Sequence, residues 1–161
     1  MTKLSRKNSR SVRVAARALI CEGDTLLTIQ MRDQSGIFHI LPGGGQNHGE
    51  TLKESLGREC REELGCEIEV GELCYVREYI GGNHKFSNFH QDFHQLEVVF
   101  KAKLLGEPNE SAATETDRKQ VGIEWISFEN LRSKRFLPEA LISILTSRHP
   151  FPDDRYLGDV N

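Results

Sequence analysis

Residues 44–66 read GGQNHGETLKESLGRECREELGC, and the second half of this stretch contains three closely spaced glutamates, Glu59, Glu62 and Glu63. A helix turns about 100° per residue, so Glu62 and Glu63 project about 60° and about 40° from Glu59. Like charges at these spacings destabilise an isolated helix by roughly 0.2–0.5 kcal/mol per pair. A hard divalent cation with oxygen ligands would offset the repulsion, so the cluster predicts the metal site of an enzyme.

The residues around the acids predict a helix over 50–64. Leu56, Cys60 and Leu64 form an apolar stripe opposite most of the acidic arc, and we expect Gly57 beside them to permit close packing. Gly65 is placed to end the helix in a left-handed conformation. The alternative is a solvated, salt-bridged helix face. The spaced glycines, and the lack of lysines at the positions that would pair with the acids, favour the metal site over it.

Short apolar runs elsewhere predict a mixed sheet. A hairpin is expected around Glu22-Gly23-Asp24, and a second helix is expected over 138–147. The expected strands cover 12–21, 25–31, 37–41, 68–80, 95–105 and 122–128. This alternation of strands with helices indicates an α/β (α+β) fold, a sandwich with a central mixed sheet.

The chain has 161 residues, which predicts a single domain over 11–148. We expect residues 1–10 to form a flexible basic arm and residues 149–161 an extended tail. The net charge of −3 argues against nucleic acid as the main partner, although the first 13 residues carry five basic side chains and no acid.

The cysteine pattern predicts neither a zinc ribbon nor a disulfide framework. Cys21, Cys60, Cys66 and Cys74 contain no CxxC pair. No apolar stretch approaches the roughly 20 residues of a membrane span, and none resembles a secretory signal. Reduced thiols in the cytoplasm are therefore the expected state.

The spacing within residues 44–66 resembles the Nudix box, the signature of the Nudix hydrolases. All seven fixed positions of the box match, and the two bulky aliphatic positions hold Cys60 and Cys66, which pack as small hydrophobic residues. The matching residues are Gly44, Glu50, Arg58, Glu59, Glu62, Glu63 and Gly65. The flanking Leu41-Pro42-Gly43 and the order of elements fit the family as well, so the resemblance implies a Nudix-type α/β/α sandwich.

The resemblance also implies a reaction. Nudix enzymes cleave the pyrophosphate of a nucleoside diphosphate linked to another moiety, such as a nucleotide sugar, ADP-ribose, a dinucleoside polyphosphate or a (d)NTP. By the family pattern Glu59 and Glu63 are ligands of Mg²⁺ or Mn²⁺, and Glu62 is a ligand or a base. A carbonyl of the Gly43–Gly45 segment, taken as that of Gly44, completes the metal shell. Arg58 would orient the neighbouring carboxylates.

Several residues outside the box are further candidates. Glu97 and Glu115, with Glu110 beside the latter, are candidates for a general base. Phe86 and Phe89 are candidates to stack on a nucleobase, the alternative being that they cover the core or a dimer contact. His48 is a candidate to contact the phosphates.

The sequence alone does not identify the substrate. Gly81 and Gly82 occupy the positions where a proline or a tyrosine marks the ADP-ribose and diadenosine polyphosphate subclasses. Two other functions remain as alternatives: an RNA-end-processing enzyme that uses the basic arm, and a non-catalytic nucleotide sensor. Related enzymes are often homodimers, and the tail could pack across such an interface or against its own sheet.

Overall fold

The computed structural model describes residues 11–84, 90–110, 119–147 and 154–161. The elements in chain order are β1 (Arg13–Glu22), β2 (Thr25–Asp33), β3 (Gly36–Ile40), β4 (Gly43–Gly45), α1 (Leu52–Leu64), β5 (Ile68–Ile80), η1 (Gly81–Asn83), β6 (His94–Leu104), β7 (Gln120–Ser127), α3 (Phe128–Leu131), α4 (Ala140–Leu145) and β8 (Tyr156–Asp159). The expected basic arm at residues 1–10 lies outside the described residues, as do Phe86, Phe89 and Glu115.

Strand β1 is the centre of the sheet, which runs β3-β2-β1-β6-β5-β8 with β4 paired to β1 and β7 to β2. β1 pairs in parallel with β6, through Ala16 opposite Val98, and antiparallel with β4, through Ala16 opposite Gly44. The sheet is therefore mixed, as predicted. The expected hairpin is present, with Gly23 in the left-handed region at a φ of 54°.

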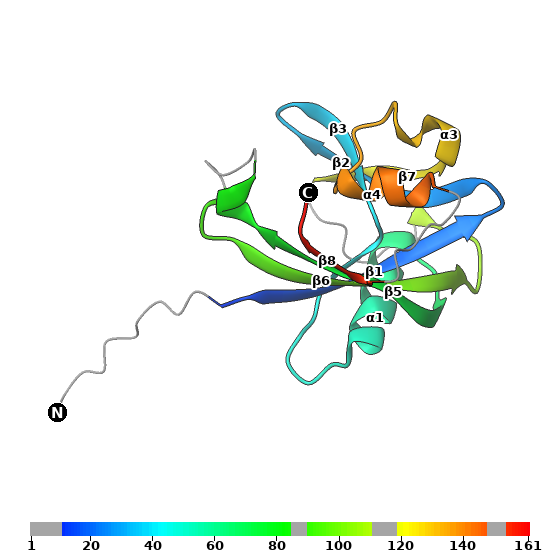
Figure 1. Cartoon of the computed structure of the whole chain (residues 1–161). Coiled ribbons are helices and arrows are strands. Elements are labelled where there is room, and N and C mark those ends of the chain that lie inside the picture. Colours follow the sequence, from blue (N-terminus) through cyan, green and yellow to red (C-terminus); the bar gives the residue numbers. More distant parts are fainter. Residues whose placement is uncertain (1–10, 85–89, 111–118, 148–153) are drawn as a thin grey trace, which may run out of the picture.

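Helices cover both faces of the sheet, which confirms the predicted three-layer sandwich. Figure 1 shows α1 on one side of the strands and α3 and α4 on the other. On the first side, the apolar stripe of α1 packs against β1 and β6. On the second side, Leu141 and Leu145 of α4 pack with Tyr75 and Val99 of β5 and β6. Among the described residues, no helix is long and apolar enough to cross a membrane.

Residues 154–161 belong to the sheet. β8 pairs in parallel with β5, with Val76 opposite Tyr156. Of the two arrangements left open for the tail, the structure shows packing against its own sheet. The four cysteines are free, and Cys60 is fully buried in the core, as its place in the apolar stripe predicts.

Candidate active site around the acidic helix

Helix α1 begins two residues later than expected. Thr51 is the N-cap: its hydroxyl accepts from the Glu54 N–H, while the Glu54 carboxylate accepts from the Thr51 N–H at 2.7 Å. This capping box satisfies two free backbone donors at the helix start. Glu50 therefore precedes the helix and does not belong to its first turn. At the other end Gly65 adopts a φ of 66°, as predicted for the residue that ends the helix.

The burial of α1 determines which way its acids point. Leu56, Cys60 and Leu64 are all completely buried. Gly57 does not serve the predicted close packing, since an added Cβ there would meet only Arg61 Nη1, at 3.9 Å. With the apolar stripe held against the sheet, the acidic arc lies on the side of β4, where the glycines of the box begin.

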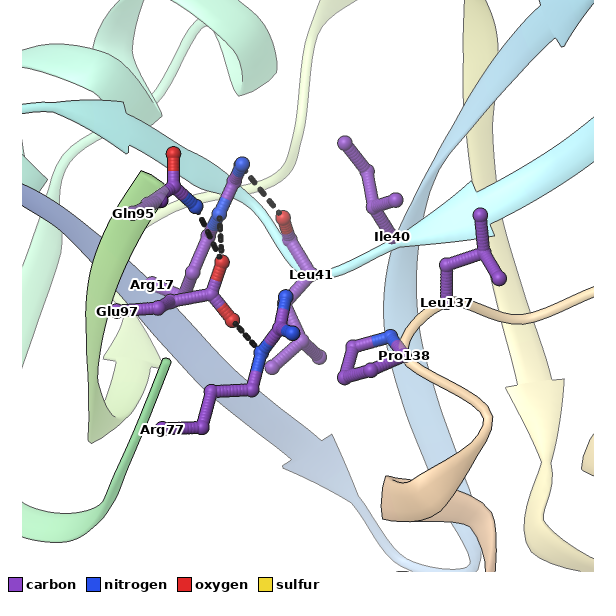
Figure 2. Close-up of a pocket in the computed structure, with 8 residues that line it drawn as sticks. All are labelled: Arg17, Ile40, Leu41, Arg77, Gln95, Glu97, Leu137 and Pro138. Atoms are coloured by element: carbon purple, nitrogen blue, oxygen red, sulfur yellow. Dashed lines mark hydrogen bonds and ion pairs between the residues drawn. The ribbon is translucent and has the colours of Figure 1, made fainter. Parts of the chain in front are cut away.

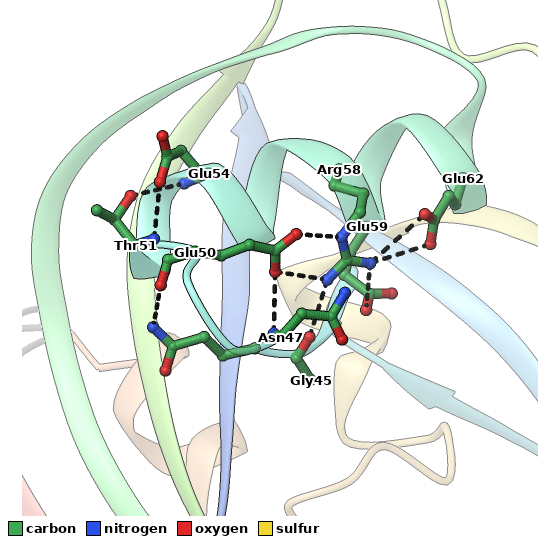
Figure 3. Close-up of polar contacts among 9 residues, drawn as sticks. Gly45, Asn47, Glu50, Thr51, Glu54, Arg58, Glu59 and Glu62 are labelled. Atoms are coloured by element: carbon green, nitrogen blue, oxygen red, sulfur yellow. Dashed lines mark hydrogen bonds and ion pairs between the residues drawn. The ribbon is translucent and has the colours of Figure 1, made fainter.

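Arg58 is the hub of the polar network on this helix (Figure 3). Its Nε and Nη2 donate to the two carboxylate oxygens of Glu50 at 2.7 and 3.0 Å, and Nη2 also donates to the Gly45 carbonyl at 3.0 Å. Its Nη1 donates to Glu59 at 3.0 Å and to Glu62 at 3.3 Å. The predicted contact with the neighbouring carboxylates is present, and the loop before the helix is tied to the same guanidinium.

Glu50, just before the helix, is paired with Arg58. The hydrogen bonds from Arg58 hold the pKa of Glu50 down, at about 2, and the backbone N–H of Asn47 contributes to the same shift. Glu50 is thus a permanently ionised anchor for Arg58. The bidentate pair fastens the glycine-rich loop to the middle of α1.

Strand β4 approaches the carboxylates so closely that only glycine fits. A Cβ on Gly44 would lie 2.5 Å from the carboxyl carbon of Glu59. Gly43 has a φ of 122°, and a Cβ there would lie 2.2 Å from the Ala16 carbonyl oxygen of β1. The Gly43 N–H donates to Glu63 at 2.7 Å. The glycines thus allow β4 to lie between β1 and the acidic side of α1.

Glu63 is the carboxylate with the strongest need for a cation. The pKa of Glu63 is raised to about 7, chiefly by burial and also by the neighbouring Glu59 and Glu62, against the opposing effects of Arg17 and the Gly43 N–H. An acid that resists ionisation for these reasons is stabilised in its charged form by a bound metal ion. Three carboxylates and a backbone carbonyl are hard oxygen donors, which fit Mg²⁺ or Mn²⁺.

The side chains as they stand are turned toward protein partners. Within the described ranges, no three His, Cys, Asp or Glu side chains are arranged to hold a metal ion. The reason lies in the contacts above, because Glu59 and Glu62 face Arg58 whereas Glu63 faces the Gly43 N–H. Metal binding at this site requires these carboxylates to exchange those hydrogen bonds for the ion.

Comparison with known proteins identifies the family. The family model described as the NUDIX domain matches residues 11–145. The chain belongs to this family. The model covers most of the chain and includes the glycine-rich strand, the acidic helix and the sheet on which they pack. Nudix hydrolases are enzymes that act on nucleotide derivatives, and they generally use divalent cations.

Individual relatives agree with this assignment. The chain is 38% identical over 61 residues to "Nucleoside triphosphatase NudI" of Enterobacter sp. (strain 638), a match that covers 34% of this chain and 43% of that protein. The matched segment thus spans less than half of that relative. A MutT NUDIX hydrolase from Burkholderia pseudomallei superposes with a TM-score of 0.60 at 26% identity, over 75% of this chain and 87% of the other. A NUDIX hydrolase from Nitrosomonas europaea gives 0.67 at 19% identity, over 83% and 85%.

A second polar cluster of this Nudix fold lies on the face of the sheet away from α1 (Figure 2). Its centre is Glu97 of β6, which is 3% exposed. The Glu97 carboxylate accepts from Arg77 Nε at 2.8 Å, from Gln95 Nε2 at 3.1 Å and from Arg17 Nε at 3.3 Å. Burial alone would raise the pKa of Glu97, but the charges of Arg77 and Arg17 outweigh it and leave that pKa below its usual value.

Arg17 links this cluster to the Nudix box. Its Nη1 donates to the Leu41 carbonyl at 3.2 Å and to the Gly43 carbonyl. Gly43 is the residue whose N–H contacts Glu63. The two clusters therefore lie on either side of Gly43, whose N–H and carbonyl belong to successive peptide units. Glu97, a candidate base from the sequence, is connected to the helix carboxylates through Arg17 and Gly43.

The remaining candidates are dispersed. His48 lies exposed in the loop between β4 and α1. Glu110, the alternative to Glu115, accepts from the Ile123 N–H at 3.1 Å. Sequence reasoning did not single out Arg17 and Arg77, although each is a charged residue with apolar neighbours inside a strand. That signal marks a candidate, but it does not say which strands will bring two such charges together.

Proposed function

We propose that this protein is a divalent-metal-dependent Nudix hydrolase that cleaves the pyrophosphate linkage of a nucleoside diphosphate joined to another group, the nucleoside triphosphates included. One observation carries the proposal. Glu59, Glu62 and Glu63 gather on one side of α1 against Gly44, where a Cβ would displace the Glu59 carboxylate, and the half-buried Glu63 is stabilised in its charged form by a positive ion. A structural salt-bridge face would need neither this close approach nor a carboxylate with a raised pKa.

Each residue of the site has a separate proposed role in this reaction. Glu59, Glu63 and Glu62, together with the Gly44 carbonyl, would hold Mg²⁺ or Mn²⁺. When bound, the ion polarises phosphoryl oxygens and lowers the pKa of water. Arg58, fastened by Glu50, holds Glu59 and Glu62 in position, and Glu62 is our candidate to take the proton from the attacking water. His48 stays a candidate for phosphate contact from the exposed loop.

We assign Glu97 a positioning role and do not assign it the role of base. Three protein donors occupy its carboxylate, and two of them are arginines that keep it ionised. A base that must collect a proton gains nothing from charges that lower its pKa. Glu97 instead sets the directions of Arg17 and Arg77, and all three residues line one small cavity.

Nucleoside triphosphates are the first substrates to try, because the curated relatives matched above are named nucleoside triphosphatases. The test is a Mg²⁺- and Mn²⁺-dependent screen for released phosphate and pyrophosphate. It covers (d)NTPs, nucleotide sugars, ADP-ribose and dinucleoside polyphosphates. Turnover of at least one class, abolished by a chelator, is the expected result. No turnover of any class with either metal would overturn the proposal.

Matched variants locate the activity in the box. Glu59→Gln and Glu63→Gln should lower kcat by a factor of about 100 or more, because each removes a metal ligand. Glu67→Gln is the control: this carboxylate is exposed just beyond α1, where it pairs with the exposed Arg61. Equal hydrolysis in all three variants would place the reaction outside the box, whereas nucleotide binding without hydrolysis in the wild type would point to a binding module without catalysis.

A further inference from the structure

Arg13, the first residue of β1, lies over strand β4. A Cβ on Gly45 would lie 2.7 Å from Arg13 Nη2 and 3.2 Å from its Nε, so the guanidinium rests where any other residue at position 45 would place its side chain. One residue earlier in the chain, Gly44 makes a similar close approach to the Glu59 carboxylate. A guanidinium and a proposed metal ligand thus contact neighbouring glycines of one short strand.

These contacts limit the distance between the two charged groups. Consecutive Cα atoms are about 3.8 Å apart, so the carboxyl carbon of Glu59 and Nη2 of Arg13 are separated by at most about 12 Å. An ion bound at Glu59 would lie about 2.1 Å from its ligand oxygens, and a hydrogen bond from Arg13 would take about 2.8 Å. The distance that remains suits the two linked phosphoryl groups of a diphosphate.

Arg13 has hydrogen-bond donors available for a ligand. It is exposed, and its Nη1 donates to Gln95 Oε1, a neutral acceptor. Within the described ranges this is its one hydrogen bond, and no carboxylate there forms an ion pair with it. The other two arginines beside β4 are committed, Arg58 to three carboxylates and a carbonyl, and Arg17 to one carboxylate and two carbonyls. Nε and Nη2 of Arg13 can therefore serve a ligand.

Gln95 fixes the position of the Arg13 guanidinium. It lies opposite Arg13 in the pairing of β1 with β6 and is only 5% exposed. Its Nε2 donates to Glu97 at 3.1 Å, which leaves Oε1 as the atom for Arg13. Glu97 is held in turn by Arg17 and Arg77, as Figure 2 shows. The buried cluster thus orients an exposed arginine, and a group oriented in advance loses less conformational freedom when it binds a ligand.

The proposed substrate brings negative charge that needs a second cation. Its diphosphate carries at least two anionic phosphoryl groups, whereas three carboxylates already surround the proposed metal ion. Arginine suits a phosphoryl group because two parallel N–H groups of its planar fork bind two oxygens at once. Nε and Nη2 form such a pair on one edge of the Arg13 guanidinium.

We propose that Arg13 is a phosphate ligand: its Nε–Nη2 edge binds the phosphoryl group next to the one that the cation holds. The inference rests on the proposed hydrolysis of nucleotides and adds the side chain that anchors the diphosphate. It also gives the two glycines separate purposes. Gly44 makes room for a carboxylate of the metal site, and Gly45 makes room for the arginine.

The direct test is binding of inorganic pyrophosphate in the presence of Mg²⁺, measured by calorimetry. Arg13→Gln should raise Kd about 10- to 100-fold, because it removes charge-assisted hydrogen bonds to phosphate. Arg13→Lys keeps the charge without the fork and should lie between the two. Arg32→Gln is the matched control, since it removes the same charge from an exposed position on β2 and should leave Kd unchanged. A Kd within about twofold of wild type in Arg13→Gln would overturn the inference.

Gly45→Ala tests the same contact from the side of β4. The added methyl group would displace the guanidinium and leave its charge on the protein, so pyrophosphate binding should again weaken. The double variant Arg13→Gln/Gly45→Ala should bind no more weakly than Arg13→Gln, because the methyl group then displaces no arginine. Losses that add in the double variant would mean that Gly45 acts independently of Arg13, against the inference.

Two further measurements separate phosphate binding from a structural role. In Arg13→Gln, KM for a hydrolysed nucleotide should rise about 10- to 100-fold while kcat falls much less, and Mg²⁺ affinity without pyrophosphate should stay as in the wild type. An arginine that only supports the fold would instead lower the melting temperature and leave pyrophosphate affinity unchanged. Mg²⁺ affinity reduced as much as pyrophosphate affinity would assign Arg13 to the metal site and refute the proposal.

Failure of this inference is distinguishable from failure of the proposed function. Nucleotide hydrolysis with unchanged KM and unchanged pyrophosphate affinity in Arg13→Gln would leave the hydrolase intact and remove the phosphate ligand. Pyrophosphate binding that depends on Arg13, in a wild type that turns over no nucleotide, would keep the phosphate ligand and remove the hydrolase.

Discussion

Glu63 makes the metal-free protein sensitive to pH. The pKa of its carboxyl is about 7 in the folded protein, well above the value of about 4.5 for an exposed glutamate. Between these values the folded state binds more protons than the unfolded state, so ionisation of Glu63 lowers the free energy of unfolding as pH rises. Above about pH 7 the loss is complete, and a bound cation would reverse it.

Glu63→Gln should therefore raise the melting temperature of the chelator-treated protein at pH 8 and make little difference at pH 5. Glutamine keeps an oxygen for the Gly43 N–H and carries no charge. The measurement is thermal unfolding of both proteins at the two pH values, with and without Mg²⁺. Mg²⁺ should stabilise the wild type at pH 8 and leave the variant unchanged. A variant that melts lower than the wild type at pH 8 without metal would refute this account.

Arg58 is hard to replace because four groups share one guanidinium. Lysine keeps the charge but cannot reproduce the planar fork that serves Glu50, Glu59, Glu62 and the Gly45 carbonyl. We expect Arg58→Lys to lower activity or metal affinity by about 10- to 100-fold, as for other residues that orient metal ligands. Kinetics and a Mg²⁺ titration measure it. Arg61→Lys, in an exposed pair on the same helix, should change neither.

At the scale of elements, the contact between β4 and α1 depends on the absence of a side chain. Gly44→Ala would push a Cβ into the Glu59 carboxylate, so activity should be lost while the fold survives. Gly57→Ala, within α1, has open space and should stabilise the protein by about 0.5–1 kcal/mol with activity retained. Circular dichroism, thermal unfolding and the nucleotide assay separate the two. Full activity in Gly44→Ala would show that the close approach is dispensable.

Local patterns predicted α1 well, since its apolar stripe, its glycine end and the side on which its acids lie all follow from helical periodicity. They missed β4, because three glycines carry no alternation of apolar and polar residues. They also missed the cluster around Glu97. Arg17, Arg77 and Glu97 come from three strands, and they meet because β6 pairs with β5, with Arg77 opposite Glu97, and in parallel with β1, which carries Arg17. Such pairing is a property of the sheet and not of any one strand.

At the scale of the whole molecule, β8 ties residues near 160 to β5 at one edge of the sheet. Asp159 accepts from the Ile80 N–H at 2.9 Å, from Asn83 at 2.7 Å and from His84 at 2.6 Å. Burial would raise the pKa of Asp159, but these hydrogen bonds outweigh it and hold that pKa below its usual value. The carboxylate thus anchors the turn η1 at the end of β5.

Asp159→Asn should loosen this anchor, because an amide replaces a charged acceptor of three donors. The loss should be about 1–3 kcal/mol in the free energy of unfolding, with faster hydrogen exchange at Ile80. Denaturant unfolding and exchange by NMR measure it. Tyr156→Phe is the comparison within the same strand, since it removes only an exposed hydroxyl contact with Glu78. Equal stability of both variants would mean that β8 is held by its backbone alone.

Gly43 has a consequence for how ligands affect one another. Its N–H donates to Glu63 and its carbonyl accepts from Arg17, so the two peptide planes that meet at its Cα each belong to one polar cluster. A cation that takes Glu63 acts on the first plane, and a nucleotide that binds Arg13 acts on the second through the hydrogen bonds that link Arg13 to Arg17. Thermodynamic reciprocity then requires that whatever factor the ion contributes to nucleotide affinity, the nucleotide returns to the ion. Cation and nucleotide become heterotropic effectors of each other, coupled through one residue of the three-residue strand β4.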